Sequence, residues 1–450
     1  MAAAEPLDSD LTHVLSTALP LADPATLDPL MERIGDARYV LLGEASHGTA
    51  EYYWWRAQLT QRLIAEKGFA FVAVEGDWPD CLDLHCSVTA APGAPEDPQQ
   101  ALEGFRRWPR WMWANTDVAR FARRLRAHNT GLPPGERVGF YGLDVYSMWE
   151  SLEAVLSYLG EHHPDQVRQA EEAYRCLEPY GPDPQTYALA TRMLPSGCEP
   201  EVVRLLVALR ERARQPADTS SVAELAALQN AETLAGAERY YRAMVRGGPE
   251  SWNIRDHHMA DTLDRLTAHH GPGAKAVVWA HNTHVGDARA TAMGPAGMIN
   301  IGQVVRERHA ADGVVLVGFG SYQGTVVAGS RWGAEARTLR VPEARAGSVE
   351  ELLHQALPEE RALFVFPPRD SGTGLHPEAA APAGWAGVRR DHRAIGVVYQ
   401  PERDAYANYV PTTLAQRYDA FLYLDRTHAL TPLHPEPPAT GEEETWPTGQ

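Results

Sequence analysis

The segment Tyr39-Val-Leu-Leu-Gly-Glu-Ala-Ser-His-Gly-Thr49 indicates the fold class of this chain. Its first residues form an unbroken apolar run, which is typical of a strand buried on both faces of a parallel sheet. Glu44 and His47 follow directly after the glycine that stops the run. Such side chains serve no packing need there, and open α/β sheets bind ligands beyond the carboxyl ends of their strands. The segment therefore predicts a functional site at one edge of a sheet.

Strands and helices alternate through the first third of the chain. After the strand at 39–43, a helix is expected over 49–66, and Gly68 is a usual helix terminator. Further strands are predicted at 69–75 and 138–144. This strand–helix–strand order predicts a mostly parallel sheet with right-handed crossovers.

The strand pattern disappears in the middle of the chain and returns later. Between 149 and 270 apolar residues recur at helical spacing, which predicts a helical insert. Later strands are predicted at 275–280, 314–319, 363–366, 395–399 and 421–424. We therefore expect an α/β fold with a mostly parallel central sheet flanked by helices, and an inserted helical bundle that forms a cap over the active-site cleft.

This fold divides the chain into four expected segments. The first part of the α/β core is expected at 1–148, the helical insert or cap at 149–270, and the second part of the core at 271–432. The Pro- and Glu-rich end, 433–450, is expected to be a disordered tail.

Composition narrows the classes of function. The 450 residues are 44% hydrophobic and 22% charged, as in ordinary globular proteins, and carry a net charge of -18. That charge argues against non-specific binding to nucleic acid or to an anionic membrane surface. The N-terminus lacks the features of a secretory signal, and no stretch is long and apolar enough to span a bilayer. A cytoplasmic location is the expectation, and the oligomeric state is left open.

Four cysteines suit neither a disulfide framework nor a thiolate zinc site. They are Cys81, Cys86, Cys176 and Cys198. A long chain without a signal rarely uses so few for disulfides, and the paired CxxC spacing of zinc sites is missing. Glycine-rich nucleotide and dinucleotide motifs are also missing, so no cofactor is expected.

Other strand ends add polar residues to the same edge. Glu75 closes the next predicted strand, and Asp144 closes the one after. Downstream, the strand in Ala276-Val-Val-Trp-Ala-His-Asn-Thr-His284 ends in His281 and His284. Buried carboxylates are costly unless they are paired, so packing alone does not explain acids at several strand ends.

These residues allow more than one interpretation. A histidine in a loop is more often structural than catalytic, and His281 and His284 also fit a polar loop after a strand. Glu44, His47, Glu75, His281 and His284 would also make a plausible set of metal ligands, although no motif such as HExxH supports it.

Arg56 and the missing nucleophile motifs narrow the chemistry. Arg56, two turns into the helix that leaves the site, could pair Glu44 or Glu75, or hold a developing oxyanion. The sequence contains no G-x-S-x-G nucleophile motif, and Ser46 lies next to the histidine in sequence, where side chains seldom face one another. The economical chemistry is activation of water, or of a substrate hydroxyl, by a histidine general base.

Several motifs, taken together and in order, resemble the erythromycin esterase family. The resemblance extends from about residue 30 to 432. The motifs lie at 43–49, 51–56, 74–80, 141–144, 253–259, 280–284 and 418–425.

The resemblance implies hydrolysis of an ester, which is a macrolide lactone in the named members. It implies that His47 activates water and that the remaining catalytic positions match Glu44, Arg56, Glu75, His281 and His284. It also implies catalysis without a metal, and an α/β core with a helical bundle. Substrate contacts are predicted from Asp77, Trp78, Asp144 and Tyr146.

The substrate and the reaction stay open within this resemblance. Some members resemble proteins labelled for succinoglycan biosynthesis, and the same core could run a cyclisation or an acyl transfer. A metal-dependent hydrolase and a binding module without catalysis are further alternatives. The expected partner is a small-molecule ester or lactone, with neither nucleic acid nor membrane, and the expected roles are antibiotic resistance or secondary metabolism.

Overall fold

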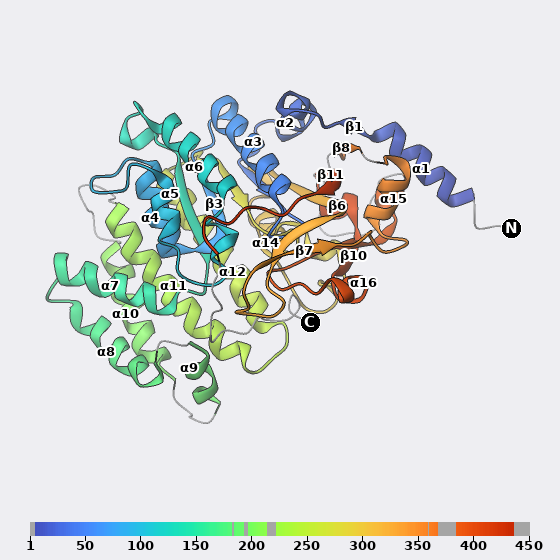
Figure 1. Ribbon diagram of the computed structural model, residues 1–450. Helices are drawn as coiled ribbons and strands as arrows, with labels where there is room; N and C mark the ends of the chain where they lie inside the picture. Colours follow the sequence, from blue (N-terminus) through green and yellow to red (C-terminus); the bar gives the residue numbers. More distant parts are fainter. Residues whose placement is uncertain are drawn as a thin grey trace.

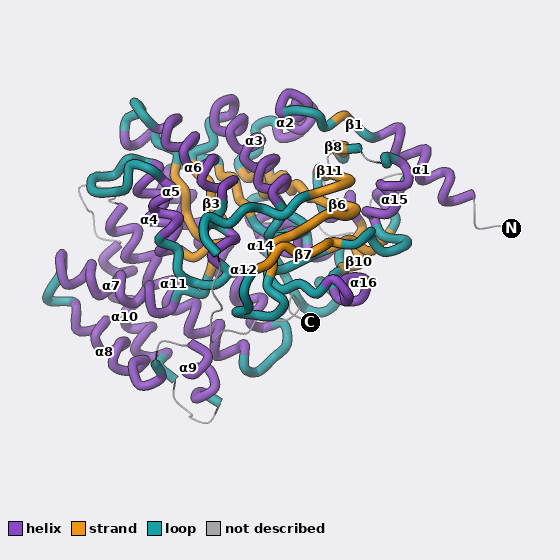
Figure 2. The backbone as a smooth tube through the Cα atoms, in the orientation of Figure 1, coloured by secondary structure: helices purple, strands orange, loops and turns teal. Residues whose placement is uncertain are grey.

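A computed structural model of the chain describes residues 5–181, 184–192, 197–213, 222–358, 360–367 and 384–435. Its centre is a nine-stranded sheet in the order β1-β8-β11-β6-β2-β5-β3-β4, with β7 paired to β6 (Figures 1 and 2). The run from β11 to β4 is entirely parallel, whereas β1, β7 and β8 pair antiparallel at its margins. The predicted α/β class, with a mostly parallel central sheet flanked by helices, is confirmed.

The strands are β1 Leu19–Pro20, β2 Tyr39–Leu42, β3 Phe71–Asp77, β4 Gly139–Asp144, β5 Ala276–Trp279, β6 Val314–Ala328, β7 Arg337–Val341, β8 Arg361–Val365, β9 Arg389–Arg393, β10 Tyr409–Thr413 and β11 Ala420–Thr427. The α-helices are α1 Glu5–Thr17, α2 Asp28–Ile34, α3 Ala50–Lys67, α4 Trp78–Val88, α5 Pro98–Glu103, α6 Thr116–Asn129, α7 Met148–His162, α8 Val167–Leu177, α9 Pro184–Thr191, α10 Glu199–Ala213, α11 Val222–Met244, α12 Glu250–His270, α13 Asn282–Val285, α14 Ile301–Arg308, α15 Val349–Ala356, α16 Asp404–Ala407 and α17 Leu414–Arg417.

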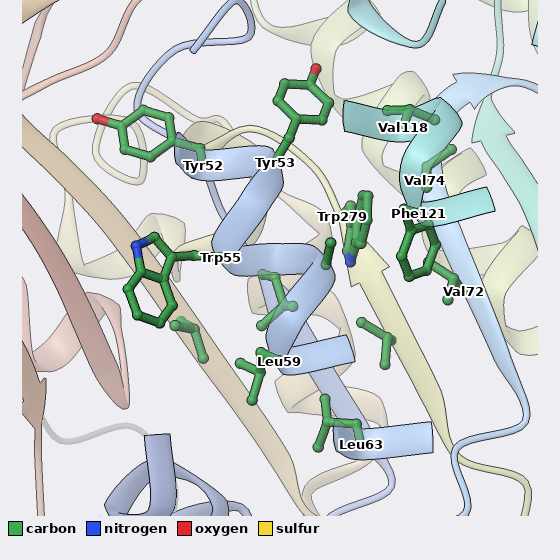
Figure 3. Close-up of a cluster of buried hydrophobic side chains, with 14 of the residues drawn as sticks. Tyr52, Tyr53, Trp55, Leu59, Leu63, Val72, Val74, Val118, Phe121 and Trp279 are labelled. Atoms are coloured by element: carbon green, nitrogen blue, oxygen red, sulfur yellow. The ribbon is translucent and has the colours of Figure 1, made fainter. Parts of the chain in front are cut away.

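The central strands are buried on both faces, as their unbroken apolar runs predict. In β2, Val40 and Leu42 enter one hydrophobic core, and Tyr39 and Leu41 enter the other. Figure 3 shows the first of these cores, where side chains of α3 and α6 pack on β3 and β5. Helix α3 ends at Gly68, which takes the left-handed conformation with φ of 67°.

One predicted strand is wrong. Residues 395–399 form only isolated bridges, from Ile395 to Ser46 and from Val398 to Gly329. The strand of this region lies earlier, at β9, and pairs with β10 in a separate two-stranded sheet. Ile395 and Tyr399 are buried against β6 and β7, so their apolar pattern reflects burial and not membership of a ladder.

The segment between β4 and β5 is helical, in agreement with the predicted insert. Its helices α7 to α11 lie beside the β3–β4 edge of the sheet and build a hydrophobic core of their own (Figure 1, green). Helix α12 joins this bundle to the sheet, because it packs on both α11 and β4. The exact division into four segments stays a prediction, and the expected tail lies outside the described residues from 436 onward.

The expectation about cysteines is wrong for one pair. Cys176 in α8 and Cys198, just before α10, form a disulfide with their Cα atoms 5.7 Å apart, while Cys81 and Cys86 are free. Sequence spacing gave no sign that two helices of the insert bring these residues together. Disulfides persist mainly in oxidising environments, so the cytoplasmic location stays a prediction that this bond does not support. Across the described part of the chain, no helix combines the length and apolar character needed to cross a bilayer.

We expect the Cys176–Cys198 bond to stabilise the helical insert. It closes a sequence separation of 22 residues, for which the loss of chain entropy in the unfolded state corresponds to about 3 kcal/mol. The C176S and C198S double variant should therefore unfold at lower temperature than the wild type, and Cys86→Ser should not. A thiol titration of the denatured protein that finds four free thiols before reduction would contradict the pairing.

Candidate active site

Parallel pairing places four strand ends at one edge of the sheet. Leu42 of β2 is in register with Trp279 of β5, and Trp279 is in register with Val74 of β3. At the next strand, Asp77 of β3 pairs with Asp144 of β4. The residues that follow these ends therefore meet, although they are separated by up to about 240 positions in sequence.

His47 is held by a buried carboxylate. Its Nδ1 lies 2.9 Å from Oε1 of Glu44, and Oε2 of Glu44 lies 2.6 Å from Nη2 of Arg56. Glu44 and Arg56 are inaccessible to solvent, whereas His47 reaches a pocket. Because Nδ1 of His47 is directed at the Glu44 carboxyl group, Nε2 is the ring nitrogen left to take up a proton.

His281 stands beside His47 in the neutral form. The ring centroids of the two histidines are 4.9 Å apart. Burial, together with the neighbouring His47, keeps the pKa of His281 well below its usual value. Its Nδ1 accepts a hydrogen bond from the backbone nitrogen of Thr283 at 3.3 Å, so the ring hydrogen is on Nε2. Within the described residues, that buried Nε2 has no hydrogen-bond partner.

His284 is a buried cation. Its Nδ1 lies 2.9 Å from Asp256, its Nε2 lies 3.3 Å from Glu75, and its ring stacks on Trp252 with centroids 4.4 Å apart. Burial alone would lower the pKa of His284, but the carboxylates of Asp256 and Glu75 outweigh it and raise the pKa to about 9. The ring is therefore an imidazolium at neutral pH.

Arg255 of α12 completes the charge pairing. Its guanidinium contacts Glu75 at 2.7 Å and holds Asp144 through two hydrogen bonds of 2.9 and 2.7 Å. Burial would raise the pKa of Glu75, but His284 and Arg255 keep it well below the usual range. Glu75 is also bound through Oε2 to the backbone nitrogen of His281 at 2.7 Å.

A small pocket of about 60 Å³ opens onto this edge. Much of its wall is aromatic and comes from two loops that meet at Trp108 and Trp332, whose rings lie 4.6 Å apart. The indole nitrogen of Trp108 also donates to the carbonyl of Ala334 at 3.1 Å. Among the described residues of α7 to α12, only Arg255 lines this pocket, so the loops form its wall and the helical insert contributes one side chain.

Charged side chains line the far side of the pocket. Asp77 pairs with Arg107 at 2.6 Å, and the guanidinium of Arg107 lies over the ring of Tyr146 at 4.4 Å. Asp80 lines the pocket as well, and burial, with Asp77 and Glu150 nearby, raises the pKa of Asp80 to about 7.

The structure brings nine of the ten predicted residues to this edge, in two layers. Five line the pocket, namely His47, Glu75, Asp77, Asp144 and Tyr146. Four lie behind them, namely Glu44, Arg56, His281 and His284.

Trp78 needs correction as a substrate contact. It is inaccessible to solvent and stacks on Tyr141 with centroids 5.8 Å apart, away from the pocket. The side chain of Asp77 points toward Arg107 and the pocket, but at the start of α4 the chain turns, and the next side chain enters the core.

Sequence reasoning missed Arg255, Asp256 and the aromatic wall. A signal for the first two was present, because acids at three strand ends require cations, and Arg255 and Asp256 stand inside a family-like motif at 253–259. The wall offered none, because its loops have no periodic pattern. Within the described ranges, no group of three or more His, Cys, Asp or Glu side chains has a metal-binding arrangement.

Comparison with known proteins identifies the family of this chain. The model of the family described as erythromycin esterase matches residues 64–427. The chain belongs to the erythromycin esterase family. Membership supports a hydrolase and suggests an esterase.

Three solved structures share the fold. A crystal structure of a succinoglycan biosynthesis protein has a TM-score of 0.75 and 21% identity, covering 96% of this chain and 100% of that one. A Bacillus cereus protein has a TM-score of 0.76 and 19% identity, with 95% and 99% covered. A mutant of the erythromycin esterase EreC in its open conformation has a TM-score of 0.66 and 17% identity, with 92% and 96% covered.

We expect the charge on His284 to make stability depend on pH. A histidine in the unfolded chain titrates near about 6.5, and the folded value for His284 is about 9. Its stabilising contribution is therefore complete below about pH 6.5 and is lost as the pH rises through 9. The free energy of unfolding, measured with denaturant across this pH range, should decline for the wild type. The decline should be smaller for His284→Gln.

The matched control is His85→Gln. Burial lowers the pKa of His85 to about 3, so the ring is neutral in the folded state throughout this range and in both states above about pH 7.5. The free energy of unfolding of His85→Gln should therefore decline with pH as it does in the wild type. Equal slopes for wild type and His284→Gln would contradict a buried imidazolium.

Proposed function

We propose that this protein hydrolyses a carboxylic ester or a macrolactone, with His47 as the general base. The observation that carries the proposal is the chain of buried contacts from Arg56 through Glu44 to His47, which ends in an imidazole at the wall of the pocket. A base fixed in one tautomer and facing a pocket is the arrangement that activation of water requires.

In the proposed reaction His47 takes a proton from water and later gives it to the leaving alkoxide. Nε2 of His47 takes a proton from water while the water oxygen forms a bond to the ester carbonyl carbon. Glu44 steadies the imidazolium that forms, and Arg56 balances the charge of Glu44. When the carbon–oxygen bond to the alcohol breaks, the proton on His47 passes to the departing alkoxide.

Arg255 is our candidate for stabilising the oxyanion. Arg56 is fully buried behind Glu44 and does not line the pocket, whereas the guanidinium of Arg255 does. The imidazolium of His284, 3.2 Å from Nη1 of Arg255, adds positive charge behind it. Preorganised cations in such a site favour the negative charge that develops on the carbonyl oxygen.

The proposed substrate follows from family membership. The volume of the closed pocket limits which substrate can enter without a change in the structure. Macrolide inactivation as a resistance function, or a step in secondary metabolism, is the proposed role. Drug-sized ligands occupy sites of roughly 300 to 1,000 Å³, and this pocket has about 60 Å³. A macrolactone would therefore need the contact between Trp108 and Trp332 to open.

His47→Ala should lower the rate of ester hydrolysis at least about a hundredfold, the usual contribution of a general base. The assay is a screen of purified protein against macrolides and simple esters, read by mass spectrometry. His85→Ala removes a buried histidine outside the site and should leave turnover within about twofold of wild type. Near-wild-type turnover of His47→Ala would end the assignment of the base.

Isotopically labelled water separates hydrolysis from cyclisation and acyl transfer. A hydrolase places one labelled oxygen in the product acid, whereas an attacking substrate hydroxyl or amine places none. Treatment with a chelator followed by metal analysis tests the metal-dependent alternative. We expect label in the acid and activity that survives chelation, and unlabelled product would favour the cyclase or transferase alternative.

A further inference from the structure

Asn282 stands between the two histidines of the β5 turn and is 1% exposed. Its backbone nitrogen donates to the carbonyl of Glu44 at 2.8 Å. The residue that carries the contact to His47 is therefore bonded directly to the turn that carries His281 and His284. This main-chain bond links the segment of Glu44 and His47 directly to the segment of His281 and His284.

The side chain of Asn282 fastens the same turn to β6. Its Nδ2 donates to the carbonyl of Phe319 at 2.7 Å, and its Oδ1 accepts from the nitrogen of Phe319 at 3.3 Å. The amide thus pairs with one residue of β6 as a neighbouring strand would. Gly43 makes room for it, because a Cβ there would overlap Oδ1 of Asn282.

A buried pair outside the proposed site favours the same orientation of this amide. His392 and Glu350 are inaccessible to solvent, and Nδ1 of His392 lies 2.5 Å from Oε1 of Glu350. Burial lowers the pKa of His392, so its ring is neutral, and the ionised Glu350 takes the Nδ1 hydrogen. Nε2 of His392 is then an acceptor, 3.3 Å from Nδ2 of Asn282. Only one of the two amide orientations satisfies this acceptor.

One further buried cation holds the main chain of the turn. Nη2 of Arg417, which is inaccessible to solvent, donates to the carbonyl of Asn282 at 2.7 Å. Every hydrogen-bonding group of Asn282 is therefore engaged, by Glu44, Phe319, His392 or Arg417. A residue that only filled space between strands would not need this many directed contacts.

We propose that Asn282, oriented by Phe319 and by the His392–Glu350 pair, is the positioning residue that fixes His281 and His284 relative to Glu44 and His47. It acts through those residues, because it does not line the pocket. The proposal rests on the proposed function for its kinetic consequences but not for its structural ones. Misplacement by about 1 Å at a catalytic group can lower a rate by about a hundredfold, so positioning has a measurable effect on turnover.

The test compares Asn282→Ala with Asn129→Ala. Asn129 is equally buried, and its amide also bonds the main chain, with two contacts to Val138 and one to Val88, far from the pocket. Both variants lose a buried amide, so both should lose stability. We expect kcat of Asn282→Ala to fall about 10- to 100-fold, with KM within about twofold of the wild type. We expect kcat of Asn129→Ala to remain at the wild-type value.

A second variant reports on the orienting pair. His392→Phe keeps a ring of similar size among Tyr418 and Phe421 and removes the acceptor for Asn282. Its kcat should fall less than that of Asn282→Ala, because the contacts to Phe319 remain. Wild-type kcat in both variants, or equal losses in Asn282→Ala and Asn129→Ala, would overturn the positioning role.

An NMR readout keeps the two proposals separate. The imidazole nitrogen signals of His47 and His281, assigned with His47→Gln, report their hydrogen bonds without any substrate. We expect them to shift in Asn282→Ala and in His392→Phe and to stay in place in Asn129→Ala. If the wild type hydrolyses no ester, the proposed function fails while these signals still decide the positioning role. Unchanged signals in every variant would overturn it.

Discussion

One buried carboxylate, Glu75, joins the turn after β5 to helix α12. Its Oε2 binds the backbone of His281, and its Oε1 contacts Arg255 at 2.7 Å and His284 at 3.3 Å. A charge buried without partners costs several kcal/mol, so these cations are a condition for placing Glu75 at the end of β3. Each cation then needs a further acid, which Asp144 gives to Arg255 and Asp256 gives to His284.

This chain of pairing explains why the site draws on distant parts of the sequence. Glu75 and Asp144 come from neighbouring parallel strands, but Arg255 and Asp256 come from α12, the last helix of the insert. The insert therefore contributes to the site chiefly through the helix that leads out of it. A loss of packing between α12 and β4 would leave two strand-end acids without their cation.

The strand ends could be predicted from sequence because their signal is local. In the segment at 39–49 an apolar run stops and Glu44 follows, and the same change occurs at Glu75 and His281. Parallel pairing then brings such ends together without any further information. The identity of the partner cations is not local, because it depends on how α12 crosses the sheet. The strand expected at 395–399 failed for a related reason, since burial against β6 and β7 produces the same apolar pattern as a ladder.

The aromatic wall decides what the site can admit. The core strands and their paired charges hold the side chains of His47, Arg255 and Glu75 in fixed positions. The two wall loops, in contrast, are joined by the ring contact of Trp108 with Trp332 and by the hydrogen bond from Trp108 to Ala334. Breaking these few contacts is cheaper than moving a buried ion pair, because each exposed indole still keeps water as a partner for its nitrogen. We therefore propose that the wall controls access to the pocket and the strand ends carry the chemistry, so that variation in the wall loops changes the substrate without disturbing His47.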